Sequence, residues 1–133
     1  MAARPSWQRR PLIGLLVLVA VVLTAYLVGR DAPSDRDSLS GLPVVEIGEL
    51  PADVRSTLDL IKDQGPFRYE QDGATFGNRE GLLPDEPADY YREYTVPGPD
   101  EDDRGPRRLV TGRQGEVYYT ADHYDSFVRV LDP

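Results

Sequence analysis

Glu93 lies in the middle of Tyr90–Val96, an aromatic and β-branched segment that favours a β-strand, where glutamate is disfavoured. Because side chains alternate across a strand, Glu93 shares one face with Tyr91 and Thr95. Two interpretations are open at this position alone. The residue is either a solvent-facing carboxylate on a half-exposed sheet or a general base on an open sheet face.

Three arginines, Arg104, Arg107 and Arg108, fall within five positions at the start of the next segment that favours a strand. Guanidinium groups present rigid forks of donors that match the oxygens of a phosphate. The alternative is a set of ion pairs with the acidic loop Asp100–Asp103. The cluster therefore predicts either a phosphate site or a charged surface turn.

His123 is the only histidine of the chain and lies in a loop between two strand segments. A lone loop histidine is more often structural than catalytic, but this one comes with a carboxylate and arginines. Together these are the groups needed for general acid–base cleavage of a phosphodiester. RNA carries its own nucleophile, the 2′-OH, next to the phosphorus, so such cleavage needs no metal.

The absence of cysteine excludes thiol catalysis and zinc–cysteine sites, and a single histidine excludes a His-rich metal site. We expect no metal and no cofactor.

One helix is expected in the folded part. Pro51 is suited to the first turn, and Gly65 with Pro66 ends the segment. Val54, Leu58 and Ile61 recur at the spacing of one apolar stripe.

The segments that favour strands follow this helix, apart from a short candidate edge strand at Val44–Ile47. They are Tyr90–Val96, Arg107–Thr111, Val117–Thr120 and Phe127–Leu131. The order predicts an α+β domain in which one N-terminal helix packs on one face of a small antiparallel β-sheet. The other face is then open for a functional site.

The N-terminal third differs from this domain. Leu12–Val28 is an apolar run preceded by arginines and followed by aspartates, as in an export signal. We therefore expect a hydrophobic N-terminal helix, with residues 1–29 acting as a signal peptide or membrane anchor. Residues 30–42 are expected to be a flexible linker and residues 43–133 the folded domain. This places the domain outside the cell or on the extracytoplasmic face of the membrane.

The net charge argues against a general nucleic-acid binder. Residues 31–133 carry 11 basic and 23 acidic side chains, a net charge of −12. A polyanion is bound largely through phosphate contacts, which this balance opposes. The cluster at Arg104, Arg107, Arg108 and Arg113 is a local exception.

From about Leu50 to the C-terminus the chain resembles the small microbial guanyl-specific ribonucleases, the family that includes barnase. The likeness is greatest to the acidic ribonucleases secreted by filamentous soil bacteria. Five blocks in matching order carry it: GPF at 65–67, YEQDGATFGNRE at 69–80, YYREYTV at 90–96, RGPRRLVTG at 104–112 and YYTADHY at 118–124. Any one of these blocks is weak evidence, whereas the set is specific.

The resemblance implies a role for each matched catalytic position. Glu93 corresponds to the base that takes the 2′-OH proton, and His123 to the acid that protonates the leaving oxygen. Arg104 and Arg108 correspond to the arginines that hold the phosphate. The implied activity is guanyl-specific endonucleolytic cleavage of single-stranded RNA through a 2′,3′-cyclic phosphate.

The resemblance also implies a guanine site. Glu80 corresponds to the carboxylate that accepts from guanine N1–H and the exocyclic amine, which adenine cannot satisfy. Backbone N–H groups around Asn78 and Arg79 correspond to those that meet O6 and N7. Phe76 resembles the ring that stacks on the base, and Tyr124 flanks the site.

The implied partners are single-stranded RNA and a protein inhibitor of the barstar type, and a monomer is expected. The alternative hypothesis is a non-catalytic, membrane-tethered domain that binds RNA or an inhibitor. The complete set of matched catalytic positions favours the enzyme.

Overall fold

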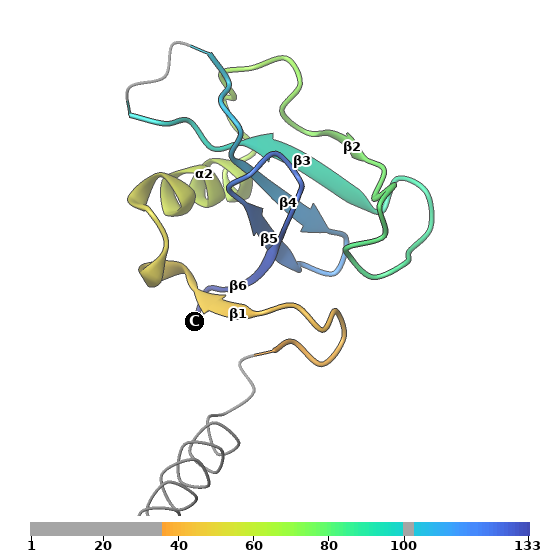
Figure 1. Ribbon diagram of the computed structural model, residues 1–133. Coiled ribbons are helices and arrows are strands. Elements are labelled where there is room, and N and C mark those ends of the chain that lie inside the picture. The colour runs from red at the N-terminus through yellow and green to blue at the C-terminus, as the bar shows by residue number, and fades with distance from the viewer. Residues whose placement is uncertain (1–35, 100–102) are drawn as a thin grey trace, which may run out of the picture. The chain divides into compact units, whose positions relative to one another are not determined.

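The computed structural model describes residues 36–99 and 103–133. Its elements are β1 (Val44–Glu46), a 3₁₀ turn η2 (Ile47–Glu49), α2 (Ala52–Lys62), β2 (Ala74–Phe76), β3 (Tyr91–Thr95), β4 (Arg108–Gly112), β5 (Val117–Thr120) and β6 (Val128–Leu131). Figure 1 shows the helix beside the sheet and the loop between β5 and β6 crossing in front of it. The predicted α+β class, with one helix on a small sheet, is confirmed for the described residues.

The six strands form one sheet in the order β1-β6-β5-β4-β3-β2. Four of the five neighbouring pairs are antiparallel, from β2 through to β6. β1 instead runs parallel to β6, with Val45 opposite Val130. The expected antiparallel sheet is therefore confirmed from β2 to β6, whereas the β1 edge differs because β1 is parallel to β6. The whole chain between β1 and β6 separates them, so no hairpin forces an antiparallel pair.

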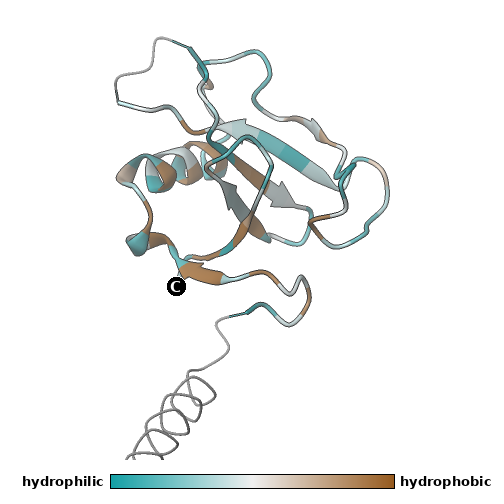
Figure 2. Cartoon of the chain, in the orientation of Figure 1, coloured by the Kyte–Doolittle hydropathy of each residue, from teal (hydrophilic) through white to brown (hydrophobic). Residues whose placement is uncertain are grey.

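The apolar stripe of α2 covers one face of the sheet. Val54 and Leu58 are buried against Leu109 of β4, Tyr119 of β5 and Val130 of β6. Figure 2 shows that α2 combines hydrophilic and hydrophobic residues, as this packing requires. The helix therefore occupies the sheet face opposite Glu93, which leaves the Glu93 face for other contacts.

An aromatic cluster fills part of the Glu93 face. Tyr91, Val110, Tyr118 and Phe127 are buried in it, and Phe76 and Tyr124 pack at its edge. The Tyr91 hydroxyl donates to the Pro84 carbonyl at 2.6 Å, which fixes the long segment between β2 and β3. The cluster thus gives this face a rigid floor beside Glu93.

β2 was not expected from the sequence. It has only three residues and lies at the edge of the sheet, where Ala74 pairs with Glu93 and Phe76 with Tyr91. Its sequence ATF is too short for alternation to indicate a strand. The strand matters because it brings Phe76 beside the segment that carries Glu93.

The N-terminal predictions fall mostly outside the described residues. This applies to the hydrophobic helix and to the signal peptide or anchor at residues 1–29. Residues 36–42, the described part of the expected linker, form a turn in which Asp37 accepts from the Ser40 hydroxyl at 2.7 Å. No helix within 36–99 or 103–133 combines the length and the apolar character needed to cross a membrane.

Leu109→Ala tests the helix-covered core. Leu109 is 0% exposed, so truncation leaves a cavity between β4 and α2. We expect the free energy of unfolding to fall by about 2–5 kcal/mol. Urea denaturation measures the loss, with Leu39→Ala as the control, because Leu39 is 83% exposed. Equal destabilisation by the two variants would contradict this packing.

Candidate active site

Glu93 lies at the centre of β3 on the face that α2 leaves open. It pairs with Ala74 on one side and Val110 on the other. Its side chain is 18% exposed, and the Tyr124 hydroxyl donates to Oε2 at 3.0 Å. Arg104 Nη2 lies 3.8 Å from Oε1. The carboxylate is thus held on two sides and still reached by solvent, as a base that must meet a substrate requires.

Tyr124 acts as a donor to this carboxylate. Burial and the neighbouring Glu93 charge raise the pKa of the Tyr124 phenol above its ordinary value. The hydroxyl therefore stays protonated at neutral pH and can donate continuously to Glu93. The sequence predicted only that Tyr124 flanks the base site, so this contact with the carboxylate is a further finding.

Arg108 is buried, at 3% exposure, at the start of β4. Its Nη1 donates to the carbonyls of Gly105 and Arg107, both at 2.7 Å. These partners are neutral, and no carboxylate of residues 36–99 or 103–133 lies within ion-pair distance. Arg108 is therefore fixed in place while its charge remains available to an anion.

Arg104 lies beside Arg108 and is fixed by a residue of β3. Its Nε donates to the Thr95 hydroxyl at 3.1 Å. Among the described residues, neither Arg104 Nη2 nor Arg108 Nε has a hydrogen-bond partner, although both atoms are buried. Buried donors are rarely left unpaired. The pair is therefore suited to an anionic ligand such as a phosphate.

Arg107 is not part of this cluster. Its guanidinium donates to the Pro97 carbonyl and lies 3.4 Å from the Asp53 carboxylate of α2. Strand alternation explains the difference, because Arg107 and Arg108 point to opposite faces. The alternative prediction paired the arginines with the acidic loop Asp100–Asp103. Residues 100–102 of that loop lie outside the described residues.

His123 lies in the loop between β5 and β6 and is exposed. Its backbone N–H donates to the Pro106 carbonyl at 3.0 Å, which ties the loop to the segment carrying Arg104. His123 and Tyr124 have φ values of 54° and 72°, a left-handed conformation that is uncommon outside glycine. The two residues need support from their surroundings to remain in it.

Asp122 supplies that support, and the sequence did not single it out. Its carboxylate accepts from Thr120 Oγ1 at 2.9 Å, Ser126 N at 2.9 Å and Ser126 Oγ at 2.5 Å. Thr120 Oγ1 in turn accepts from the Tyr124 N–H at 3.0 Å. These bonds, those from Ser126 first, hold the pKa of Asp122 below its usual value. The spacing of Asp122 and Ser126, an aspartate followed four residues later by a serine in a loop, could have indicated this role of Asp122.

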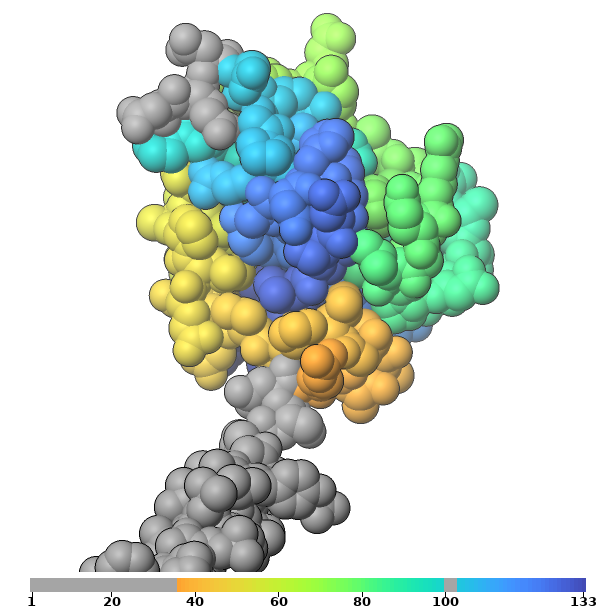
Figure 3. Space-filling model, viewed as in Figure 1, coloured from red at the N-terminus to blue at the C-terminus, as the bar shows by residue number. Residues whose placement is uncertain are grey.

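A pocket of about 620 Å³ adjoins the cluster. Its walls come from the loop after β2 and the loop after β5: Phe76, Gly77, Asn78, Arg79, Glu80, His123 and Tyr124 among others. Figure 3 shows the loop after β5, in blue, beside the green segment that contains β2. All five residues expected to bind a base are therefore brought together at one pocket.

The pocket residues are held in different ways. The Phe76 and Tyr124 rings stack, with centroids 5.3 Å apart and planes inclined by 23°. The Asn78 amide bridges the backbone of Leu83, accepting from its N–H at 3.1 Å and donating to its carbonyl at 2.9 Å. The Asn78 side chain therefore shapes the loop. Arg79 and Glu80 are exposed, so their side chains can meet a ligand.

The fold and this cluster have the features of a small α+β nuclease. A family model described as ribonuclease matches residues 33–131, and the chain belongs to that family. The resemblance drawn from the sequence blocks is confirmed.

Similar proteins are guanyl-specific ribonucleases of actinomycetes. Guanyl-specific ribonuclease St of Saccharopolyspora erythraea is 51% identical over 88 residues, which are 66% of this chain and 87% of that protein. Guanyl-specific ribonuclease Sa3 of Kitasatospora aureofaciens is 58% identical over 82 residues, 61% of this chain and 58% of that protein.

A solved structure has the same fold. Ribonuclease Sa2, crystallised with guanosine-2′-cyclophosphate, is 44% identical and superposes with a TM-score of 0.66. The match covers 68% of this chain and 97% of that one.

Asp122→Ala tests the support of the His123 loop. Removing the carboxylate frees Ser126 and Thr120, so His123 and Tyr124 are no longer fixed relative to Glu93. We expect RNA cleavage to fall by up to about 10²-fold, the effect of a misplaced catalytic group. A fluorescent RNA substrate measures the rate.

The same variant has a pH signature. Because the folded-state pKa of Asp122 is lowered, its stabilisation is present above the unfolded pKa and is lost as pH falls through the folded one. The stability difference between wild type and Asp122→Ala should therefore shrink on acidification. A difference that is unchanged at low pH would show that the carboxylate charge is not involved.

Proposed function

We propose that this chain is a guanyl-specific endoribonuclease that cleaves single-stranded RNA on the 3′ side of guanosine. The observation that carries the proposal is the arrangement around Glu93. The half-buried Glu93 carboxylate lies beside Arg104, and Arg104 and Arg108 each have one buried donor atom without a hydrogen-bond partner within the described residues. Tyr124, which donates to Glu93, also lines a pocket large enough for a base. The similar ribonucleases named above are guanyl-specific.

In the first step Glu93 removes the proton from the 2′-OH. The 2′-oxygen forms a bond to phosphorus, and the bond from phosphorus to the 5′-oxygen breaks. His123 gives its proton to that leaving oxygen. Arg104 and Arg108 stabilise the charge that grows on the phosphoryl oxygens. The products are a 2′,3′-cyclic phosphate and a free 5′-OH.

The second step reverses the roles. The now neutral His123 takes a proton from water, the water oxygen bonds to phosphorus, and the bond to the 2′-oxygen breaks. Protonated Glu93 returns its proton to the 2′-oxygen. A 3′-phosphate is released and both residues regain their starting states, so the cycle needs no metal and no cofactor.

Guanine binds in the pocket between the loop after β2 and the loop after β5. Glu80 accepts from N1–H and the exocyclic amine, and backbone N–H groups near Asn78 and Arg79 donate to O6 and N7. The stacked Phe76 and Tyr124 rings offer an aromatic surface for the base. Exposure of Glu80 on the pocket wall supports this assignment.

The proposal extends to the place of action. We place the enzyme outside the cytoplasm, exported or anchored by residues 1–29, on the basis of the apolar run and its charged flanks. A monomer and control by a barstar-type inhibitor are proposals from the family likeness. The alternative, a non-catalytic binding domain, is not favoured. Glu93 lies beside Arg104, Arg108 contacts the Arg104 backbone, and the His123 backbone is hydrogen-bonded to the same segment, which supports an enzyme.

Glu93→Gln and His123→Ala test the mechanism. Each variant removes one proton-transfer group, so kcat should fall by about 10²–10⁴-fold. Cleavage of GpU in EDTA by the compact unit Asp35–Pro133 provides the assay. The wild type should show a bell-shaped pH–rate profile, and each variant should lose one limb. Undiminished cleavage by His123→Ala would refute its role.

Glu80→Ala tests base recognition. The variant removes the acceptor for the guanine edge, so the preference for GpU over ApU should fall by about 1–3 kcal/mol. Competition between the two dinucleotides measures the preference. Glu70→Ala is the control, because Glu70 is also exposed and lies outside the pocket. An unchanged preference in Glu80→Ala would place guanine recognition elsewhere.

A further inference from the structure

Tyr69 lies beside the catalytic cluster but has no part in the chemistry described above. Its half-buried ring lies 6.0 Å from the Arg104 guanidinium, and its hydroxyl donates to the Asp103 carbonyl at 3.1 Å. Exposed Arg68 lies over the same ring, at 5.4 Å. An aromatic ring flanked by arginines is the combination with which proteins bind an unpaired base and its phosphates.

The structure fixes Tyr69 relative to Glu93. The Asp72 carboxylate accepts from the Tyr69 N–H at 3.3 Å and from the Thr95 N–H, at the end of β3, at 2.7 Å. The Gly73 N–H donates to the Glu93 carbonyl at 2.8 Å. The segment before β2, which contains Tyr69, is therefore hydrogen-bonded to β3 at Glu93 and at Thr95.

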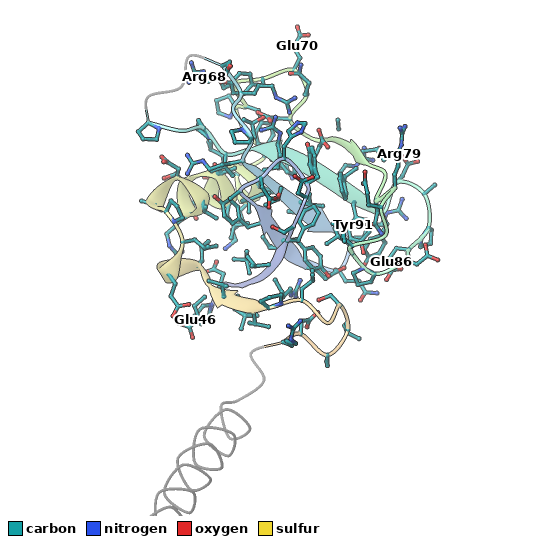
Figure 4. The ribbon with its side chains drawn as sticks, viewed as in Figure 1. Glu46, Arg68, Glu70, Arg79, Glu86 and Tyr91 are labelled. Carbon is teal, nitrogen blue, oxygen red and sulfur yellow. The ribbon has the colours of Figure 1, made fainter. Side chains whose placement is uncertain are left out.

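Tyr69 and the guanine pocket lie on opposite sides of Glu93. Antiparallel pairing sets Phe76 opposite Tyr91, Ala74 opposite Glu93, and Asp72 beside Thr95. The chain thus runs from the base pocket past the carboxylate to Tyr69. Figure 4 shows the same separation, with Arg68 and Arg79 far apart at the two ends of this segment.

The general acid also connects to the Tyr69 side. The carbonyl of Pro106 accepts from the His123 N–H, and the carbonyl of Asp103 accepts from the Tyr69 hydroxyl. One four-residue segment, 103–106, therefore contacts both residues. In the proposed reaction the leaving nucleoside departs beside His123, and this segment connects the His123 backbone to the Tyr69 hydroxyl.

We propose that Tyr69 and Arg68 form the subsite for the nucleoside on the 3′ side of the cleaved bond. The base stacks on the Tyr69 ring, and Arg68 moves from the ring to the next phosphate of the RNA. This inference rests on the proposed ribonuclease function. It predicts that the enzyme distinguishes substrates by the base of the nucleoside attached 3′ to guanosine, with purines favoured because they stack over a larger area.

The test compares two substrates of the full-length chain. GpA contains a leaving nucleoside, whereas guanosine 2′,3′-cyclic phosphate contains none. Tyr69→Leu should lower kcat/KM for GpA by about 5- to 100-fold, the effect of losing one base–aromatic stack. Hydrolysis of the cyclic phosphate should stay within about two-fold of wild type, which also shows that the variant is folded. Tyr69→Phe keeps the ring and should retain GpA cleavage.

Arg68→Gln tests the phosphate contact. It should lower kcat/KM for GpUp, which carries a further 3′-phosphate, and leave GpU unchanged. Arg92→Gln is the matched control, because Arg92 is exposed, loses the same charge and points to the opposite face of β3 from Glu93.

The outcomes separate this subsite from the function on which it rests. If Tyr69→Leu lowered the rates for GpA and for the cyclic phosphate equally, the subsite would be overturned, because Tyr69 would then only position Arg104. No fall on GpA would overturn it as well. Wild-type protein inert on both substrates would instead refute the ribonuclease function and the subsite with it.

Discussion

The contact between the Tyr124 hydroxyl and the Glu93 carboxylate joins the two halves of the site. Tyr124 belongs to the loop after β5, whereas Glu93 belongs to the middle of β3. For the two to meet, the loop must fold back over the sheet, and His123 and Tyr124 must both adopt left-handed backbone conformations. The Asp122 hydrogen bonds and the contact to Pro106 stabilise that path. Stability of this loop is therefore a condition for catalysis.

Burial of positive charge in an acidic protein is the second constraint. Residues 31–133 carry a net charge of −12, yet Arg108 is buried among neutral carbonyls. Pairing it with a carboxylate would relieve the desolvation cost but would also compete with substrate. Because side chains alternate along the strand, Arg107 points to the helix face and pairs with Asp53, whereas Arg108 points to the site without a carboxylate partner among the described residues. Affinity for phosphate is thus confined to the site around Arg104 and Arg108, although the domain as a whole is acidic.

Sequence patterns predicted the helix and five of the six strands of the described residues, and they singled out the candidate catalytic residues. The apolar stripe of α2 and the alternation around Glu93 depend only on residues close together in the sequence. Such patterns can therefore be recognised before the fold is known. The parallel β1–β6 pair could not be predicted, because it joins segments over 80 residues apart and depends on the whole topology. The same holds for the role of Asp122 and for the tie between Asp72 and Thr95, which are set by loop geometry. No sequence pattern indicated a binding role for Tyr69, which depends on its contacts with Arg104 and Asp103 in the fold.

Phosphorus NMR of GpU during turnover in EDTA tests the central claim most directly. We expect guanosine 2′,3′-cyclic phosphate to appear first and then to be converted to guanosine 3′-phosphate. Cleavage that released a 5′-phosphate, or that gave the 3′-phosphate with no cyclic species at any time, would contradict it. Either result would mean that the Glu93, Arg104, Arg108 and His123 cluster does not direct the 2′-oxygen to phosphorus.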